Sequence, residues 1–192
     1  ITAGLGEQSP EVCLAAMKKA REYGVTVSFD FNYRSKMWTR EKAGKVFAQL
    51  LPYVDVLTAG AEDIRDFLGV PWDEQETVDG KLTPDGYRHL LKELCDTRPF
   101  KAVASTMREN RSASDNSWSG VLYMDGQTYF SRKYEIHLVD RIGGGDSFCA
   151  GLLYGLWAGF DAQKTVEYAT AASCLKHTIE MDMNLSGVDE VL

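Results

Sequence analysis

Short hydrophobic runs alternate with amphipathic segments along most of this chain. The runs predict strands at residues 25–29, 54–58 and 100–106. Apolar side chains at helical spacing predict helices at residues 9–24, 39–51, 62–68 and 83–95. Strands that alternate with helices are typical of an α/β fold, so we expect a doubly wound, mostly parallel sheet flanked by helices.

The later part of the chain contains a different pattern. Asp125-Gly126 lies between two apolar runs and predicts a β-hairpin. Two helices should follow, the first directly after three consecutive glycines and the second at residues 161–178. The first of these helices carries glycines at four-residue spacing, which should let it lie close against the sheet: Gly151, Gly155 and Gly159. Two stretches should lack regular structure, residues 70–82 and 108–117.

Composition and charge restrict the classes of partner. The 192 residues are 44% hydrophobic and 26% charged, as in a globular protein, and the net charge is −7. An acidic surface argues against nucleic acid or an anionic membrane as the main partner. The four cysteines and three histidines are scattered without disulfide-framework or metal-site spacing, which favours reduced thiols in the cytoplasm. No signal peptide is visible, and the longest uncharged run is too short to span a bilayer.

The three consecutive glycines form the most unusual stretch, between Asp140 and Asp146. Glycines allow a positive φ and bring backbone N–H groups close to a ligand. A helix that begins there adds unpaired N–H groups and the positive end of its dipole, so the turn predicts an anion site. An aspartate inside an anion site suggests phosphoryl transfer, with Asp146 as the base that orients a hydroxyl. The alternative is a simple turn in which Asp146 caps the helix.

The same stretch is similar to the second signature of the ribokinase/PfkB family of sugar kinases. The similarity lies in Asp-x-x-Gly-Gly-Gly-Asp followed by a small polar residue and an aromatic one. The resemblance implies a ribokinase-like fold, ATP and Mg²⁺ as cofactors, and Asp146 as the catalytic base. It also implies that the amides of Gly143, Gly144 and Gly145 form the anion hole. Asp140 would then organise phosphates and magnesium.

The wider pattern resembles 2-keto-3-deoxygluconate kinases within that family. The segment from Asp30 to Arg34, with Trp38 beyond it, looks like their acid-sugar segment. The resemblance implies four substrate-binding residues: Asp30, Asn32, Tyr33 and Arg34. The Arg34 guanidinium suits a carboxylate better than a lysine would. Fructokinases carry a similar segment and Arg34 could instead form a surface ion pair, so the substrate stays open.

The resemblance extends to the nucleotide side. Residues 104–108 and 112–116 look like the strand and loop of the same subgroup, and residues 176–178 with Asn184 look like its segment beside the adenine. The implied nucleotide-binding residues are Ser105, Thr106, Arg108, Asn116, His177 and Asn184. Ordinary helix-end chemistry explains the last two equally well.

The metal motif departs from the family pattern. Many members have Asn-x-x-Glu after the strand that ends near residue 58, whereas this chain has Gly60 and Asp63 there. Asp63 or its neighbour Glu62 remains a candidate metal residue, together with Asp140.

The resemblance covers residues 1–192 but only the later part of the family fold. The first strands, the lid and the glycine-rich sugar-binding segment have no counterpart here. The chain is therefore expected to be the C-terminal portion of a single ribokinase-like kinase domain, inactive as an isolated fragment. The expected partners are a sugar acid and ATP, and the full-length protein is expected to form a homodimer through its lid. A fructokinase or another sugar kinase is the alternative, and a non-catalytic nucleotide- or sugar-binding module is a third possibility.

Four polar segments follow predicted strands or open predicted helices. They are residues 30–34, 60–63, 105–108 and 140–146. In doubly wound sheets, ligands bind beyond the carboxyl ends of the strands. We therefore expect the four segments to converge on one edge.

Overall fold

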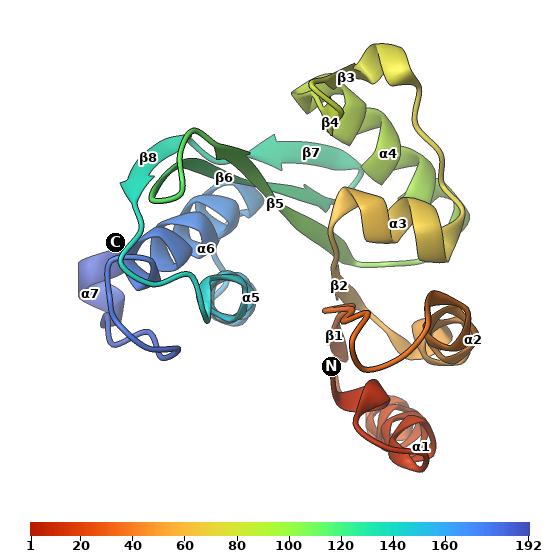
Figure 1. Cartoon of the computed structure of the whole chain (residues 1–192). Coiled ribbons are helices and arrows are strands. Elements are labelled where there is room, and N and C mark those ends of the chain that lie inside the picture. The colour runs from red at the N-terminus through yellow and green to blue at the C-terminus, as the bar shows by residue number, and fades with distance from the viewer. The chain divides into compact units, whose positions relative to one another are not determined.

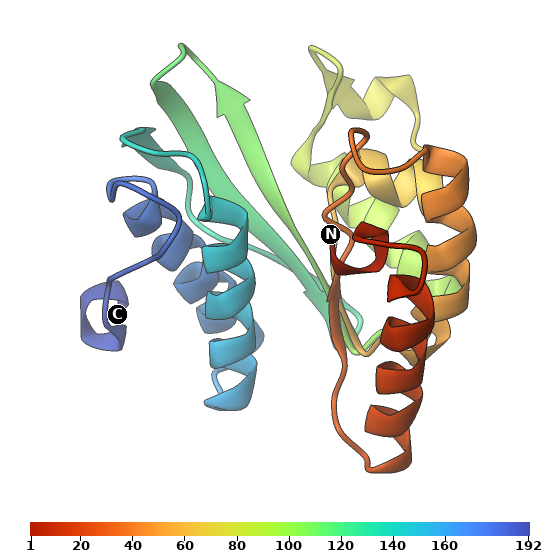
Figure 2. The same cartoon turned by 60° about the horizontal axis from the view of Figure 1, so that its bottom comes forward.

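The computed structural model describes residues 1–192, which divide into two compact units, residues 1–103 and 104–192 (Figures 1 and 2). Strand β5 (Ala102–Asn110) begins in the first unit and continues in the second. That the chain is one portion of a single domain stays a prediction. Each unit is described by itself.

The first unit contains a parallel strand pair and four α-helices. The strands are β1 (Ser28–Asp30) and β2 (Val56–Thr58), and Phe29 lies opposite Leu57. The helices are α1 (Ser9–Glu22), α2 (Arg40–Leu50), α3 (Ala61–Leu68) and α4 (Pro84–Thr97). Short 3-10 turns lie at Thr2–Gly4 (η1), Leu51–Tyr53 (η2) and Glu74–Glu76 (η3). The strand order is β1-β2-β5.

Local sequence explains where these helices begin and end. The Thr39 side chain accepts a hydrogen bond from the Lys42 N–H at the start of α2. Thr83 does the same for Gly86 at the start of α4, where proline occupies the first helical position. Gly69 ends α3 with φ of +69°.

Aromatic rings fill the core of the first unit. Phe31 and Phe47 are at most 1% exposed, and their ring centroids lie 4.7 Å apart. Phe67 contacts both rings. Full burial of one such side chain contributes about 1.5–3 kcal/mol. This core holds the carboxyl end of β1 against α2 and α3.

Helix α1 forms as predicted, but it has no fully buried residue. Of the side chains that the spacing placed inward, Cys13 and Met17 are half-buried, whereas Tyr23 is 73% exposed. The helical spacing therefore predicted the helix correctly and overestimated how deeply it is buried.

The second unit contains most of β5, three further strands and three helices. The strands are β6 (Asp115–Met124), β7 (Gln127–Phe130) and β8 (Tyr134–His137), and β6 pairs with both others. The helices are α5 (Gly144–Trp157), α6 (Ala162–Lys176) and the short α7 (Val188–Val191). Helices α5 and α6 pack together on one face of the strands (Figures 1 and 2).

The sheet is mixed and flanked by helices, which confirms the predicted α/β class. The parallel arrangement holds for β1 and β2, whereas β6 is antiparallel to β7 and β8. The predicted hairpin is present: Asp125 and Gly126 have φ of +51° and +77°, as a two-residue turn between antiparallel strands requires.

Three local predictions were wrong. The irregular stretch predicted at residues 108–117 is limited to residues 111–114, because β5 extends to Asn110 and β6 begins at Asp115. Residues 70–82 contain η3 and a small hairpin, β3 (Thr77–Val78) with β4 (Lys81–Leu82), instead of an open loop. Gly151 and Gly155 approach helix α6 and not the sheet: a Cβ at Gly151 would lie 2.8 Å from the Ala169 Cα.

No helix combines the length and the apolar character that a membrane span needs.

Candidate active-site residues

The turn before α5 requires glycine both for its backbone conformation and because neighbouring atoms leave no room for a side chain. Gly143 is the N-cap residue with φ of +80°, and a Cβ there would lie 1.9 Å from the Asp182 carbonyl oxygen. A Cβ at Gly144 would lie 2.5 Å from the His177 ring, whereas one at Gly145 would meet no atom within 4 Å. Two of the three glycines are therefore required by close packing, and the third faces open space.

Unpaired backbone N–H groups gather at this turn. The Gly144 N–H donates a 3.4 Å hydrogen bond to the Arg141 carbonyl, and the Ser147 N–H donates one of 2.8 Å to Gly143. The N–H groups of Gly143, Gly145 and Asp146 have no partner within the chain. Because the α5 dipole adds positive potential here, the turn can bind an anion. The resemblance implies the amides of Gly143, Gly144 and Gly145 for this role. In the structure the Gly144 N–H is hydrogen-bonded within the chain, whereas the Asp146 N–H, which was not predicted, has no partner.

The Asp146 carboxylate lies in the first turn of α5 and is exposed. It forms no hydrogen bond or ion pair within the chain, and no side chain caps this helix. The alternative in which Asp146 merely caps the helix is therefore not observed. The carboxylate is free to accept a proton from a bound hydroxyl.

Asp140 connects the turn to the segment after α6. Its two carboxylate oxygens accept hydrogen bonds from the N–H groups of Ile142, at 3.0 Å, and Met181, at 3.1 Å. The bond from Ile142 is the main cause that lowers the pKa of Asp140, against a smaller desolvation effect, and Met181 lowers it further. Asp140 thus holds two segments together, and its metal role stays a prediction.

His177 lies directly beneath the turn. Its side chain is 1% exposed, its Nδ1 is 2.7 Å from the Ser173 carbonyl, and its ring packs edge-on against Trp118. Burial lowers the pKa of His177, which favours a neutral ring that donates its Nδ1–H to Ser173.

Asn184 also supports the turn with its side chain. Its amide nitrogen donates to the Ser147 Oγ at 2.7 Å and to the Ala172 carbonyl at 3.0 Å, and its Oδ1 accepts the Ser186 N–H. The amide is therefore fully engaged within the chain. The predicted nucleotide contacts of His177 and Asn184 stay predictions.

The remaining nucleotide candidates lie on β5 and β6. Ser105 is fully buried, Thr106 is half-buried and Arg108 is exposed. Asn116 is 1% exposed, and neither its amide nitrogen nor its amide oxygen has a hydrogen-bond partner. Buried polar groups rarely remain unpaired, so Asn116 stands out in this unit.

Arg141 was not among the residues that the sequence singled out for the site. Its guanidinium donates a 3.5 Å hydrogen bond to the Ala113 carbonyl, which links the glycine turn to the β5–β6 connection. The positive charges of Arg141 and Arg108 both lower the pKa of His177, after the larger effect of burial. Two guanidinium groups therefore lie near the anion turn. The presence of a cation, Arg141, inside the glycine signature is the sequence signal that could have indicated this role.

In the first unit, the acid-sugar segment follows β1 and the Gly60–Asp63 segment follows β2. Because β1 and β2 are parallel neighbours, the two segments share one edge. Asn32 has φ of +40°, and its N–H donates to the Asp30 carboxylate at 3.1 Å. The structure thus brings these predicted residues together within the unit.

Arg34 is exposed and donates a 2.9 Å hydrogen bond to the Tyr33 carbonyl. It forms no ion pair, so the alternative of a surface ion pair is not observed. The Tyr33 hydroxyl donates to the Trp38 carbonyl at 3.1 Å. Arg40, which the sequence did not single out, stacks on the Tyr33 ring with 5.2 Å to its centroid and pairs with Asp66.

Asp63 is half-buried, and desolvation raises its pKa to about 6. The positive charge of Arg40 opposes this shift, whereas the nearby carboxylates of Glu62, Asp66 and Asp30 add to it. No three histidine, cysteine or acidic side chains are arranged to hold a metal ion. These carboxylates fit Mg²⁺ only in the way it usually binds in kinases, through one or two carboxylates, water and substrate phosphates.

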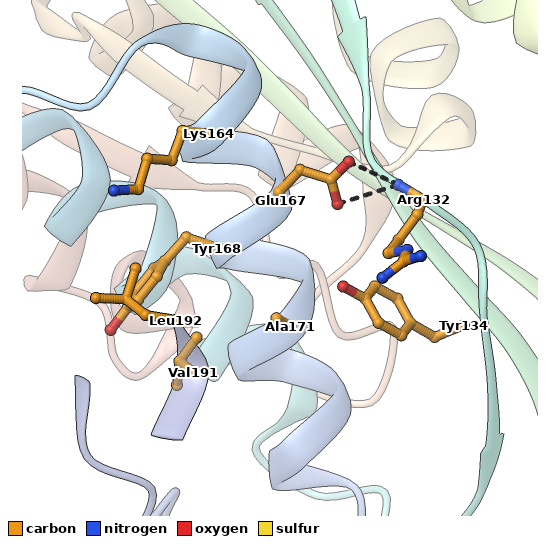
Figure 3. Close-up of a pocket in the computed structure, with 8 residues that line it drawn as sticks. All are labelled: Arg132, Tyr134, Lys164, Glu167, Tyr168, Ala171, Val191 and Leu192. Carbon is orange, nitrogen blue, oxygen red and sulfur yellow. Dashed lines mark hydrogen bonds between the residues drawn. The ribbon is translucent and has the colours of Figure 1, made fainter. Parts of the chain in front are cut away.

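A cavity of about 330 Å³ lies elsewhere in the second unit, against α6 and α7 (Figure 3). Its wall includes Tyr168, Leu192 and the Glu167 carboxylate, which accepts hydrogen bonds from the Arg132 N–H (Figure 3). None of the predicted site residues lines it. The candidate site is therefore the glycine turn and not this cavity.

The chain is similar to several sugar kinases. Over its whole length it is 33% identical to the 2-dehydro-3-deoxygalactonokinase of Haloferax volcanii, of which it covers 54%. It matches the crystal structure of the 2-dehydro-3-deoxygluconokinase of Thermotoga maritima with 46% identity and a TM-score of 0.90, over 98% of this chain and 55% of that one. An E. coli protein provisionally described as ribokinase II, solved with ATP and Mg²⁺, shares the fold at 19% identity and a TM-score of 0.72, over 99% of this chain and 55% of that one.

The chain spans about half the length of these relatives. The family model described as pfkB family carbohydrate kinase matches residues 2–180. This match covers most of the chain and confirms the resemblance that the glycine signature indicated. The chain therefore belongs to the pfkB family of carbohydrate kinases.

Proposed function

We propose that the full-length protein transfers a phosphoryl group from ATP to the terminal hydroxyl of a 2-keto-3-deoxy sugar acid, with 2-keto-3-deoxygluconate as the first candidate. The observation that carries this proposal is the glycine turn, where unpaired N–H groups lie beside the exposed Asp146 carboxylate. The names of the relatives from Haloferax volcanii and Thermotoga maritima support the choice of substrate.

In this proposal Asp146 accepts the proton of the attacking hydroxyl. Its carboxylate is exposed in the first turn of α5, beside the positive end of the helix dipole. The N–H groups of Gly145 and Asp146 stabilise the negative charge on the transferring group. Phosphoryl transfer depends mainly on such positioning and charge stabilisation, so few residues need to react covalently.

Arg34 binds the carboxylate of the sugar acid in this proposal. Its guanidinium is exposed and unpaired with any acidic residue, so it can form a two-point contact with a ligand carboxylate. Arg40 supports the segment indirectly, because it stacks on Tyr33, the residue that precedes Arg34.

The phosphates of ATP would lie at the glycine turn, with Arg108 and Arg141 nearby. Asp63 and Glu62 would hold Mg²⁺ through water, and the ion would supply charge neutralisation for the phosphates. The E. coli structure with ATP and Mg²⁺ supports this pair of ligands for the fold. At pH 7 most of the Asp63 population is ionised, because its pKa is about 6.

The test is sugar-dependent ADP release by the full-length gene product with Mg²⁺ present. The substrates are 2-keto-3-deoxygluconate, 2-keto-3-deoxygalactonate, fructose and ribose. We expect selective turnover of the two keto-deoxy acids. Turnover of fructose alone would keep the kinase and overturn the substrate. Saturable ATP binding without turnover of any sugar would instead indicate a non-catalytic binding protein.

A further inference from the structure

Lys176, the last residue of α6, has a fully buried side chain. It is the only lysine, arginine, aspartate or glutamate that is fully buried in this chain. Its ammonium donates a hydrogen bond to the Ile179 carbonyl at 3.0 Å. Lysines are almost never fully buried unless they are paired, because the charge loses its hydration. A neutral donor could make this single bond, so the hydrogen bond alone does not account for a lysine at this buried position.

The surroundings of Lys176 connect it to the glycine turn. Its charge acts on the Asp140 carboxylate, which also accepts the N–H groups of Ile142 and Met181. The Asp182 carbonyl, three residues after Ile179, packs directly against Gly143. Lys176 and the segment 179–182 therefore lie immediately behind the turn that presents the unpaired N–H groups.

We propose that Lys176 is a positioning residue that places a fixed positive charge behind the glycine turn and so strengthens polyphosphate binding there. This inference rests on the phosphate site of the proposed function. A buried charge acts through protein, where water and salt screen it weakly. Asp140 is half-exposed, so solvent screens its opposing charge more strongly. The ammonium therefore adds to the potential of the helix dipole, although it does not touch the ligand.

The test compares Lys176→Gln with the wild type in the full-length protein. Glutamine keeps an N–H donor for the Ile179 carbonyl but removes the charge. Lys164→Gln is the matched control, because Lys164 lies on the same helix and is exposed. Calorimetry with inorganic tripolyphosphate, ATP and adenosine measures each affinity. We expect Lys176→Gln to weaken tripolyphosphate and ATP binding about tenfold, while adenosine binding and the control change less than about twofold.

Unchanged tripolyphosphate binding by Lys176→Gln would overturn the inference, and so would an equal loss for adenosine. Should Lys176→Gln fail to fold, Lys176→Arg keeps the charge and is expected to retain tripolyphosphate affinity within about threefold. A tenfold loss in that variant would also overturn the inference. A wild type that binds tripolyphosphate but neither binds ATP nor phosphorylates a sugar would reject the proposed function alone. A wild type that does not bind tripolyphosphate rejects the inference.

Discussion

Asp63 and Asp146 occupy the same position in two different helices. Each is the third residue of a helix whose N-cap is glycine, Gly60 for α3 and Gly143 for α5. Asp63 is half-buried among other carboxylates, which raises its pKa to about 6, whereas Asp146 is exposed. The same helix position therefore gives one carboxylate that binds protons near neutral pH and one that is open to solvent.

Replacing Asp146 with asparagine tests the base directly. We expect kcat to fall about 10²–10⁴-fold, because the amide cannot accept the hydroxyl proton. ATP affinity should stay within about threefold, since the backbone N–H groups remain. Steady-state kinetics and calorimetry on the full-length protein measure the two quantities. A variant that keeps most of its kcat would remove Asp146 from the role of base.

Replacing Arg34 with alanine tests the carboxylate contact. We expect KM for 2-keto-3-deoxygluconate to rise about 10–100-fold, because a two-point charged contact is lost. Lys36→Ala is the control, since Lys36 is an exposed cation two residues away. Equal effects of the two substitutions on KM would show only a general influence of charge and would contradict a specific role for Arg34.

The raised pKa of Asp63 predicts how stability depends on pH. Because the folded state favours the protonated carboxyl, its contribution to stability is fully present below the ordinary value of 3.8 and is lost as the pH rises through about 6. Asp63→Asn should therefore raise the free energy of unfolding, relative to wild type, by about 1–2 kcal/mol more at pH 7.5 than at pH 4. Urea unfolding at the two pH values measures this difference. An equal difference in unfolding free energy between the variant and the wild type at the two pH values would contradict the raised pKa of Asp63.

At the level of secondary-structure elements, most helices could be predicted because their ends carry local signals, such as Thr39, Thr83-Pro84 and Gly69. Strand β8 could not be predicted, because four residues of mixed polarity give no clear pattern and the strand forms by pairing with distant β6. The start of β6 could not be predicted either, because polar residues such as Asn116 interrupt the apolar pattern there.

The glycine turn could be predicted as an anion site, but its supports could not. Three adjacent glycines indicate close backbone approach, yet the groups that approach, His177 and Asp182, come from more than 30 positions away. The resemblance implies nucleotide contacts for His177 and Asn184, and these stay predictions. In the structure both side chains form hydrogen bonds beneath the turn.

A matched pair of glycine substitutions tests this packing. Gly143→Ala should lower the free energy of unfolding by at least about 2 kcal/mol, because φ is positive and the methyl group would collide with the Asp182 carbonyl. Gly145→Ala should change it by less than about 0.5 kcal/mol, since the methyl group meets no atom within 4 Å. Thermal and urea unfolding of the full-length protein measure both. Similar losses for the two variants would contradict the packing described here.

Across the whole molecule, the family and the α/β class could be predicted because they depend on one signature and on repeated strand–helix alternation. The mixed character of the sheet depends in part on the Asp125-Gly126 turn, which makes β7 antiparallel to β6, and β8 adds a second antiparallel pair. Each unit brings its own predicted residues together: the segments after β1 and β2 in the first, and the glycine turn with residues 177–184 in the second. Their chemical roles remain predictions for the full-length protein.

The Asp140 carboxylate couples the stability of two backbone amides that are distant in sequence. Ile142 and Met181 donate to its two oxygens, so loss of that carboxylate releases both amides together. In native-state hydrogen exchange, the two amides should therefore open as one cooperative unit, although they lie in separate loops. Asp140→Ala should accelerate both exchange rates by similar factors. The order of the anion turn would then be inseparable from the order of the segment after α6.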